Sequence, residues 1–293
     1  PRLSALTMAL QLPSVHLILV FASWMALNLG LNYYNSLVLR NTNFRFPFLL
    51  TLVNKTIGFF VATTIMYCSK GLPKPQELKA DFMRPAVHLN GFLTAMNIGL
   101  NNWSLVFISL TLNQVMRSTI PLPTAILSMI FEGKTFSWQV WASMLLLVVG
   151  CALAACGALG SEPVGGIIIA LGSILANATW TVTAAILMQS GAKPLDAVSL
   201  LFVSGPTCIL TLVVFFCALE LPRLVSFNPD PEHPVPPPEM MLLFLGAAAT
   251  MASFYDIVHN QFIKLTSSMN MAIMGNTKVG VRTLVNCSLL LTL

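Results

Sequence analysis

The sequence predicts an all-α polytopic membrane protein, and three observations support this fold class. Hydrophobic residues make up 56% of the 293-residue chain, charged residues make up 9%, and the mean hydropathy is +0.80. These values lie outside the range of soluble globular domains. Apolar runs of about 20 or more residues recur along the chain, and a helix of that length crosses the hydrocarbon core. A water-soluble enzyme is therefore excluded.

Nine apolar segments are long enough to be membrane helices. In chain order they are residues 15–38, 46–68, 85–110, 111–131, 138–158, 164–189, 195–219, 240–265 and 270–293. The first residue is a proline and the ninth segment stops in mid-run, so we expect a fragment that lacks a tenth helix.

The first three segments differ in their polar residues. The first contains Asn28, Asn32 and Asn35, and so many amides in an apolar run indicate a face turned towards other helices. The second carries Lys55, which either binds substrate, extends to the membrane interface or pairs with an acidic side chain. A polar loop with four basic residues precedes the third segment.

The fourth segment contains Arg117 and is interrupted by Pro121 and Pro123. Such breaks are tolerated inside a membrane where other groups satisfy the freed carbonyls. Broken helices that carry a charge are typical of the binding sites of transporters.

The fifth to eighth segments follow with one long connection. The fifth is free of charge, and the glycines and alanines of the sixth suit close helix packing. The loop 220–239, after the seventh, is rich in proline and is expected to be extended. The eighth segment holds Tyr255, Asp256 and His259; the last two are either a proton relay or a structural group paired with a nearby cation.

The ninth segment carries Lys278 and Arg282, four residues apart and so on one face of a helix. At the bilayer centre each costs about 2.5 to 3.5 kcal/mol, so both are expected to face an internal cavity with water. There they either form a receptor for an anion such as phosphate or pair with an acid or a backbone carbonyl.

The distribution of lysine and arginine predicts the orientation. Eight lie on the side of the N-terminus, three lie on the other side, and four (Lys55, Arg117, Lys278 and Arg282) lie within spans. Because the excess of positive charge faces the cytosol, we expect a cytosolic N-terminus. The basic residues form no continuous patch with aromatic residues, which excludes nucleic acid as a partner.

Four stretches and one single residue resemble a known family. Residues 112–118 read LNQVMRS, with Pro121 after them, and residues 131–134 read FEGK. This pattern resembles the fourth-helix signature of the triose-phosphate and nucleotide-sugar transporter families of the drug/metabolite transporter superfamily, in which a lysine usually stands at position 117. Residues 46–51, FPFLLT, resemble the start of the family's second helix, although Asn54 stands where a histidine is common.

The last two matches lie in the eighth and ninth helices. Residues 275–279, GNTKV, resemble the ninth-helix motif, and Tyr255 resembles the aromatic residue of the eighth helix. The plastid members carry adjacent lysine and arginine in the ninth helix, whereas here the arginine follows only at position 282.

The resemblance implies a ten-helix fold of two inverted five-helix repeats, here residues 1–159 and 160–293, the second truncated. It implies an antiporter that exchanges a phosphorylated sugar or nucleotide sugar for phosphate or a nucleotide monophosphate, without a cofactor. Arg117 and Lys278 would bind the phosphate and Tyr255 the organic part, with Asn276, Arg282 and Lys55 as further candidates. A Golgi or endoplasmic reticulum membrane is expected, with the plastid inner envelope as the alternative.

Three other functions stay open from the sequence. One is a proton-coupled transporter that uses Asp256 and His259, a second is an intramembrane enzyme, and a third is a polytopic receptor. The enzyme has little support, because the sequence has no metal-spaced cluster, no Gly-x-Ser-x-Gly elbow and no phosphate loop. The oligomeric state is not predicted.

Overall fold

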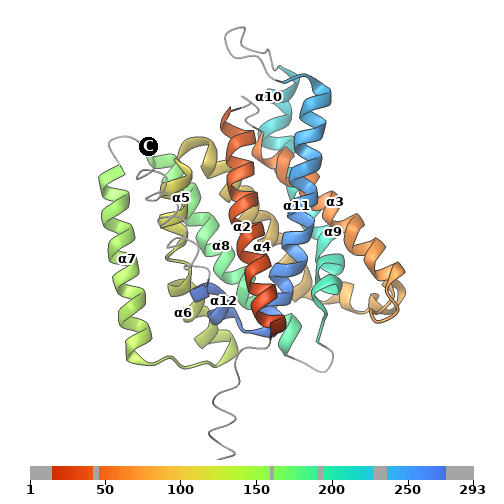
Figure 1. The fold of residues 1–293 in the computed structure, drawn as a ribbon, viewed down its shortest axis with the longest axis horizontal. Coiled ribbons are helices and arrows are strands. Elements are labelled where there is room, and N and C mark those ends of the chain that lie inside the picture. Colours follow the sequence, from red (N-terminus) through yellow and green to blue (C-terminus); the bar gives the residue numbers. More distant parts are fainter. Residues whose placement is uncertain (1–14, 42–45, 159–161, 191–193, 227–235, 275–293) are drawn as a thin grey trace, which may run out of the picture.

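The computed structural model describes residues 15–41, 46–158, 162–190, 194–226 and 236–274, and every regular element in them is helical (Figure 1). The helices are α2 Val15–Asn41, α3 Pro47–Cys68, α4 Pro85–Phe107, α5 Leu110–Arg117, α6 Pro121–Glu132, α7 Trp138–Ala158, α8 Val164–Gln189, α9 Ala197–Phe215, α10 Leu221–Val225, α11 Pro238–Leu265 and α12 Ser268–Met274. Single turns occupy Pro75–Leu78, Asp81–Met83 and Phe216–Glu220. The predicted all-α class is confirmed.

Five of the described helical stretches are long and apolar enough to cross a membrane. They are His16–Leu39, Pro47–Cys68, Val164–Gln189, Ala197–Val225 and Glu239–Leu265. Helix α4, with 23 residues, is not one of them, and it carries asparagines at positions 90, 97, 101 and 102. Of the ninth predicted segment, only the part up to Met274 lies within the described residues.

The fourth predicted segment is divided into two helices, as its prolines indicate. Helix α5 begins after Ser109, whose hydroxyl accepts a hydrogen bond from the backbone nitrogen of Leu112 at 3.3 Å. It ends at Arg117, and α6 begins at Pro121, which has no N–H to donate. The break therefore falls directly after the arginine.

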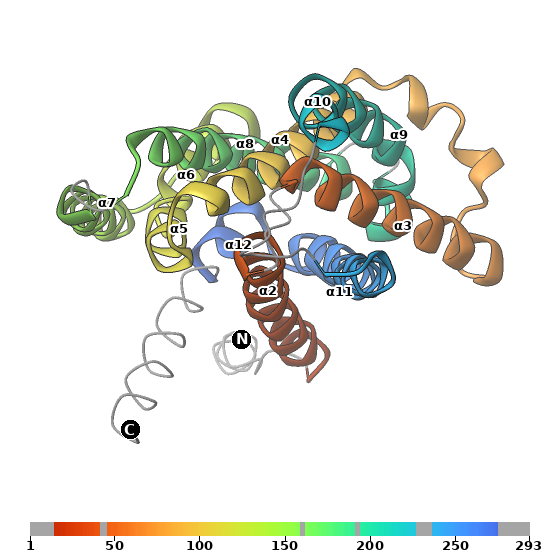
Figure 2. The same ribbon diagram turned by 90° about the horizontal axis from the view of Figure 1, so that it is seen from above.

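Helices α2, α3, α4, α8, α9 and α11 surround a common interior, as the view from above in Figure 2 shows. Helix α4 lies between α8 and α9, α3 lies between α9 and α11, and α11 packs against α2. Helices α4 and α9 meet closely at Gly91, where an added Cβ would lie 2.5 Å from the backbone oxygen of Ser204. Helices α5, α6 and α7 lie to one side, and α12 packs against α6.

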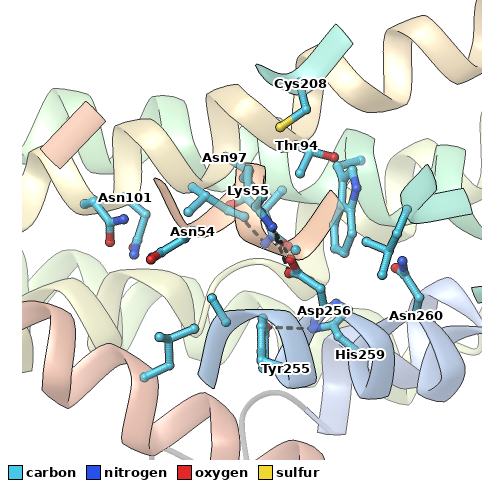
Figure 3. Close-up of a pocket in the computed structure, with 18 of the residues that line it drawn as sticks. Asn54, Lys55, Thr94, Asn97, Asn101, Cys208, Tyr255, Asp256, His259 and Asn260 are labelled. Atoms are coloured by element: carbon cyan, nitrogen blue, oxygen red, sulfur yellow. Dashed lines mark hydrogen bonds and ion pairs between the residues drawn. The ribbon is translucent and has the colours of Figure 1, made fainter. Parts of the chain in front are cut away.

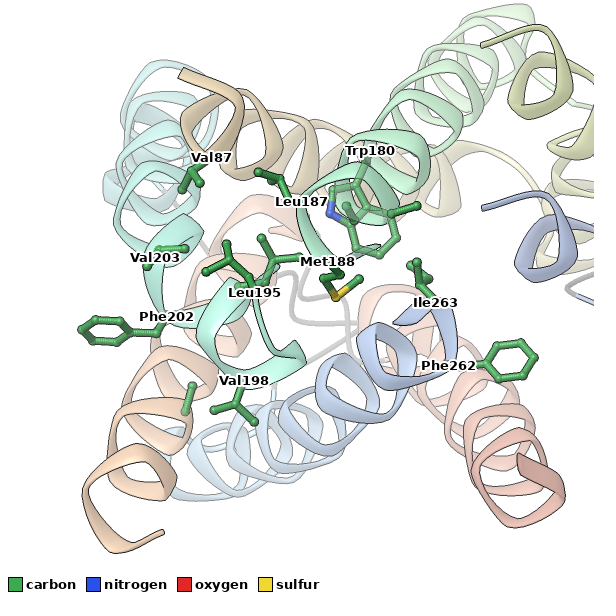
Figure 4. Close-up of a cluster of buried hydrophobic side chains, with 14 of the residues drawn as sticks. Val87, Trp180, Leu187, Met188, Leu195, Val198, Phe202, Val203, Phe262 and Ile263 are labelled. Carbon is green, nitrogen blue, oxygen red and sulfur yellow. The ribbon is translucent and has the colours of Figure 1, made fainter. Parts of the chain in front are cut away.

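The lower end of the bundle, where α2 and α9 begin and α8 and α11 end in Figure 1, is filled by apolar side chains (Figure 4). The indole ring of Trp24 lies nearly parallel to the ring of Phe262, with 5.4 Å between their centres. Other members of this lower cluster are Val87, Trp180, Leu187, Met188, Leu195, Val198, Phe202, Val203 and Ile263. Burial of these side chains ties α2 and α11 to α8 and α9.

Candidate functional site

A cavity inside the six-helix group has ten asparagines among its lining residues (Figure 3). Its asparagines are Asn28, Asn32, Asn35, Asn54, Asn90, Asn97, Asn101, Asn102, Asn177 and Asn260. An amide offers both donors and acceptors, so this wall suits a polar ligand. The structure also brings five sequence-predicted site residues to the cavity: Lys55, Arg117, Tyr255, Asp256 and His259.

Arg117 enters the cavity from the last turn of α5, and every acceptor that it contacts is neutral. Its guanidinium donates to Asn101 Oδ1 at 3.0 Å, to Ser173 Oγ at 2.9 Å and to Asn97 Oδ1 at 3.4 Å. The ion pairs in the described part of the chain involve Lys55, Arg84, Lys134 and Lys264 rather than Arg117. The guanidinium therefore keeps an uncompensated positive charge towards the cavity.

Helices α4 and α8 hold these acceptors in place. Asn97 and Asn101 are one turn apart on α4, so their side chains lie on one face. Ser173 of α8 donates its own hydrogen to the backbone oxygen of Asn97 at 2.9 Å, which leaves a lone pair for Arg117. Asn177, one turn further along α8, donates to Asn97 Oδ1 at 3.1 Å. The four side chains form a fixed neutral support for the guanidinium.

Lys55 has a different environment on the other side of the cavity. Its ammonium lies 2.8 Å from Asp256 Oδ1 and 2.6 Å from Asp256 Oδ2, and the two side chains are 9% and 10% exposed. The pair joins α3 to α11 and carries no net charge. Of the possibilities that the sequence left open for Lys55 and Asp256, the structure has the ion pair.

His259 lies in a hydrogen-bonded cluster with Trp24, Tyr255 and Asn28. The indole nitrogen of Trp24 can only donate, and it lies 2.9 Å from His259 Nδ1, so this ring nitrogen carries no hydrogen. The hydroxyl of Tyr255 accepts from Asn28 Nδ2 at 2.8 Å and lies 2.6 Å from the same ring nitrogen. These contacts link α11 to α2.

Three candidates from the ninth helix, Asn276, Lys278 and Arg282, lie outside the described residues. The described chain reaches Met274 in α12, whose Ser268 bonds to Glu132 and Ser128 of α6.

The supports of Arg117 were missed from the sequence. Asn90, Asn97 and Asn101 follow the spacing i, i+7 and i+11, which puts them on one face of a helix. The amides of the first segment are interpreted as a face turned towards other helices, and the same interpretation could have been applied to these asparagines. Ser173 has no such signal, because a single serine in an apolar helix commonly bonds to its own backbone.

Comparison with known proteins gives one family and a set of relatives. The model of the Triose-phosphate Transporter family matches residues 15–291. An Arabidopsis thaliana protein named "Probable sugar phosphate/phosphate translocator" is 24% identical over 92% of this chain and 73% of its own length. UDP-uronic acid transporter 1 of the same plant is 24% identical over 90% and 84%, and its GDP-mannose transporter GONST5 is 25% identical over 92% and 76%.

Proposed function

Because this chain belongs to the Triose-phosphate Transporter family, it is an integral membrane transporter and not an enzyme, and we propose that it is an antiporter. In this proposal it exchanges a phosphorylated sugar or nucleotide sugar for phosphate or a nucleotide monophosphate. Relatives named as sugar phosphate/phosphate translocators and as nucleotide-sugar transporters support both substrate classes.

The observation that carries the proposal is the uncompensated charge of Arg117. A guanidinium that faces a cavity and contacts only neutral oxygens attracts an anion strongly, because little water competes there. Its planar fork matches two oxygens of a phosphate, and three hydrogen bonds to the protein leave further N–H groups for a ligand. Arg117 is the residue to which we assign the phosphate.

The proposed site has further members. Tyr255 presents its ring to the cavity and is assigned to the organic part of the substrate. From the sequence alone, Lys278 is assigned to the phosphate, and Asn276 and Arg282 are further candidates for contact with the substrate. The lipid bilayer surrounds the apolar helices, and we propose a Golgi or endoplasmic reticulum membrane with a cytosolic N-terminus.

Exchange rather than net transport follows from the charge of the empty site. A cavity with an uncompensated cation resists the change of conformation that would carry it across the membrane, and a bound anion removes this cost. The division into inverted repeats, residues 1–159 and 160–293, belongs to this proposal, because inverted halves allow the site to open to each side in turn.

The proton-coupled alternative has less support. Lys55 contacts both oxygens of Asp256, and the indole N–H of Trp24 donates to His259 Nδ1. Protonation of Asp256 would remove the charge that pairs with Lys55, and protonation of His259 Nδ1 would displace the hydrogen bond from Trp24.

The test is counterflow in liposomes that contain the full-length protein. Vesicles preloaded with phosphate, UMP or GMP should take up labelled sugar phosphates or nucleotide sugars much faster than empty vesicles do. Equal rates in loaded and empty vesicles would contradict antiport. Uptake that follows an imposed proton gradient without an internal anion would support the alternative.

A further inference from the structure

The hydrogen bonds around Asn35 fix the direction in which its amide acts. Thr51 Oγ1 donates to the backbone oxygen of Pro47 at 2.7 Å, because a carbonyl oxygen only accepts. Asn102 Nδ2 must then donate to Thr51 Oγ1, at 2.8 Å, and Asn102 Oδ1 accepts from Asn35 Nδ2 at 3.4 Å. This chain of bonds leaves Asn35 Oδ1 without a protein partner among the described residues, although Asn35 is only 5% exposed.

Asn260 of α11 is fixed in the same way. Its Nδ2 lies 3.5 Å from the backbone oxygen of Ala197, which again only accepts. Its Oδ1 has no protein partner within the described chain, and the residue is 2% exposed. Asn35 and Asn260 both line the same cavity, so water or a ligand there can supply the O–H or N–H donor that each buried oxygen needs.

The two acceptors lie far apart along the bundle. Helices α2 and α11 run in opposite directions and meet where Asn28 bonds to Tyr255 (Figure 1). Asn35 lies about 10 Å above this contact and Asn260 about 7.5 Å below it, from the helical rise of 1.5 Å per residue. The acceptors are thus separated by roughly 18 Å along the axis.

Arg117 lies between these two levels. Its guanidinium bonds to Asn101 and Asn97 on α4, and Asn102, the partner of Asn35, is the next residue above Asn101. Asn97 lies about 7.5 Å below Asn102 along that helix. The cavity therefore has a cation between its two ends, one free acceptor towards each end, and a third free acceptor, Asn54 Oδ1, in its wall.

The two ends differ in their other lining groups. The lower end, with Asn260, includes the ring of Trp180 and that of Phe59. The upper end, with Asn35, includes the amides of Asn32 and Asn102. Aromatic rings favour stacking of a planar base, and amides favour hydroxyl groups.

We propose, resting on the proposed function, that the cavity binds a nucleoside-diphosphate-linked sugar with Asn260 at the base and Asn35 at the sugar. In such a molecule the phosphates lie in the middle, with hydrogen-bond donors on both sides. A sugar monophosphate has its phosphate at one end and reaches only one of the two acceptors. Asn35 and Asn260 are then the residues that determine specificity for the two arms.

The experiment measures binding and exchange with reconstituted full-length protein. The ligands are UDP-galactose, GDP-mannose, UMP, GMP, galactose 1-phosphate and mannose 1-phosphate. Wild-type protein should exchange at least one nucleotide sugar better than either sugar monophosphate. Asn260→Ala should lower the affinity for the nucleotide sugar and for its nucleotide alike, by about two- to tenfold. Asn35→Ala should lower the affinity for the nucleotide sugar only.

Asn113→Ala is the matched control. Asn113 is also fully buried with an unpartnered Oδ1, but it does not line the cavity. The Asn113→Ala variant should leave the relative affinities for the six ligands unchanged. Exchange of sugar monophosphates with no exchange of nucleotide sugars would overturn this inference and leave the proposed function intact. Loss of UMP or GMP affinity in Asn35→Ala would overturn the assignment of the arms, and failure to exchange any phosphorylated ligand would contradict the proposed function itself.

Discussion

Lys55 and Arg117 are two cations on the wall of one cavity, and the structure gives them opposite surroundings. Lys55 contacts both oxygens of a buried carboxylate, whereas Arg117 contacts two amide oxygens and a hydroxyl. The first cation is neutralised within the protein. The second has its geometry fixed but its charge left for a ligand.

This contrast separates stability from binding. Removal of one partner of the ion pair buried between α3 and α11 lowers the stability of the fold, because the remaining charge has no partner. A cation held by neutral dipoles has no single partner to lose. Changes at Lys55 and Asp256 should therefore act mainly on the fold, and changes at Arg117 mainly on the substrate.

The largest expected effect is on stability, from Asp256→Ala. It leaves the ammonium of Lys55 buried without its carboxylate, and the loss should be about 3 to 5 kcal/mol. The double variant Lys55→Met with Asp256→Leu should recover most of it. Melting temperatures in detergent give the comparison.

The partly exposed pair of Lys264 with Asp196 is the control for this prediction, because its side chains are 33% and 39% exposed. Asp196→Ala should cost no more than about 1 kcal/mol. An Asp256→Ala protein as stable as wild type would show that the buried pair is not a structural link.

The second prediction is the converse, from Arg117→Met. Exchange should fall by about ten- to a hundredfold, since each lost charge-assisted hydrogen bond to phosphate is worth about 1.5 to 3 kcal/mol. The melting temperature without ligand should stay near that of wild type, because removal of an uncompensated charge offsets the lost bonds to neutral oxygens. A drop of many degrees would make Arg117 a structural residue instead.

Much of the fold follows from the sequence because local properties decide it. Apolar runs of membrane length predict the helices, and Pro121 predicts the break between α5 and α6. The same reasoning brings Arg117 into the interior, since lipid excludes a charge whatever the rest of the chain does.

The partners of the two cations depend on contacts that no local pattern reveals. Lys55 and Asp256 are 201 positions apart, and Arg117 and Ser173 are 56 positions apart. The sequence shows that Lys55 is charged, but it does not show whether an acidic side chain lies near enough to pair with it. Only the packing of α3 against α11 decides the outcome. The amide face of α4 was predictable from spacing, but its role in supporting Arg117 was not.

A smaller effect should come from Arg117→Lys, which keeps the charge and removes the fork. An ammonium cannot bond to two phosphate oxygens in the plane of a guanidinium, so affinity for phosphate should fall about tenfold. Competition by unlabelled phosphate against a labelled substrate measures this. Wild-type affinity in the lysine variant would mean that charge alone, and not its geometry, selects the anion.

The smallest expected effect tests whether the neutral support matters at all. Ser173 donates to Asn97 and accepts from Arg117, so Ser173→Ala loosens the guanidinium without altering the charge of the cavity. Phosphate affinity should fall about two- to tenfold, and the exposed Ser143→Ala on α7 should have no effect. If Ser173 acts only by holding Arg117, its replacement in an Arg117→Met background should change affinity no further, because the two residues share one interaction. An equal loss in both backgrounds would mean that Ser173 contacts the substrate itself, and the distinction between support and ligand would then not hold.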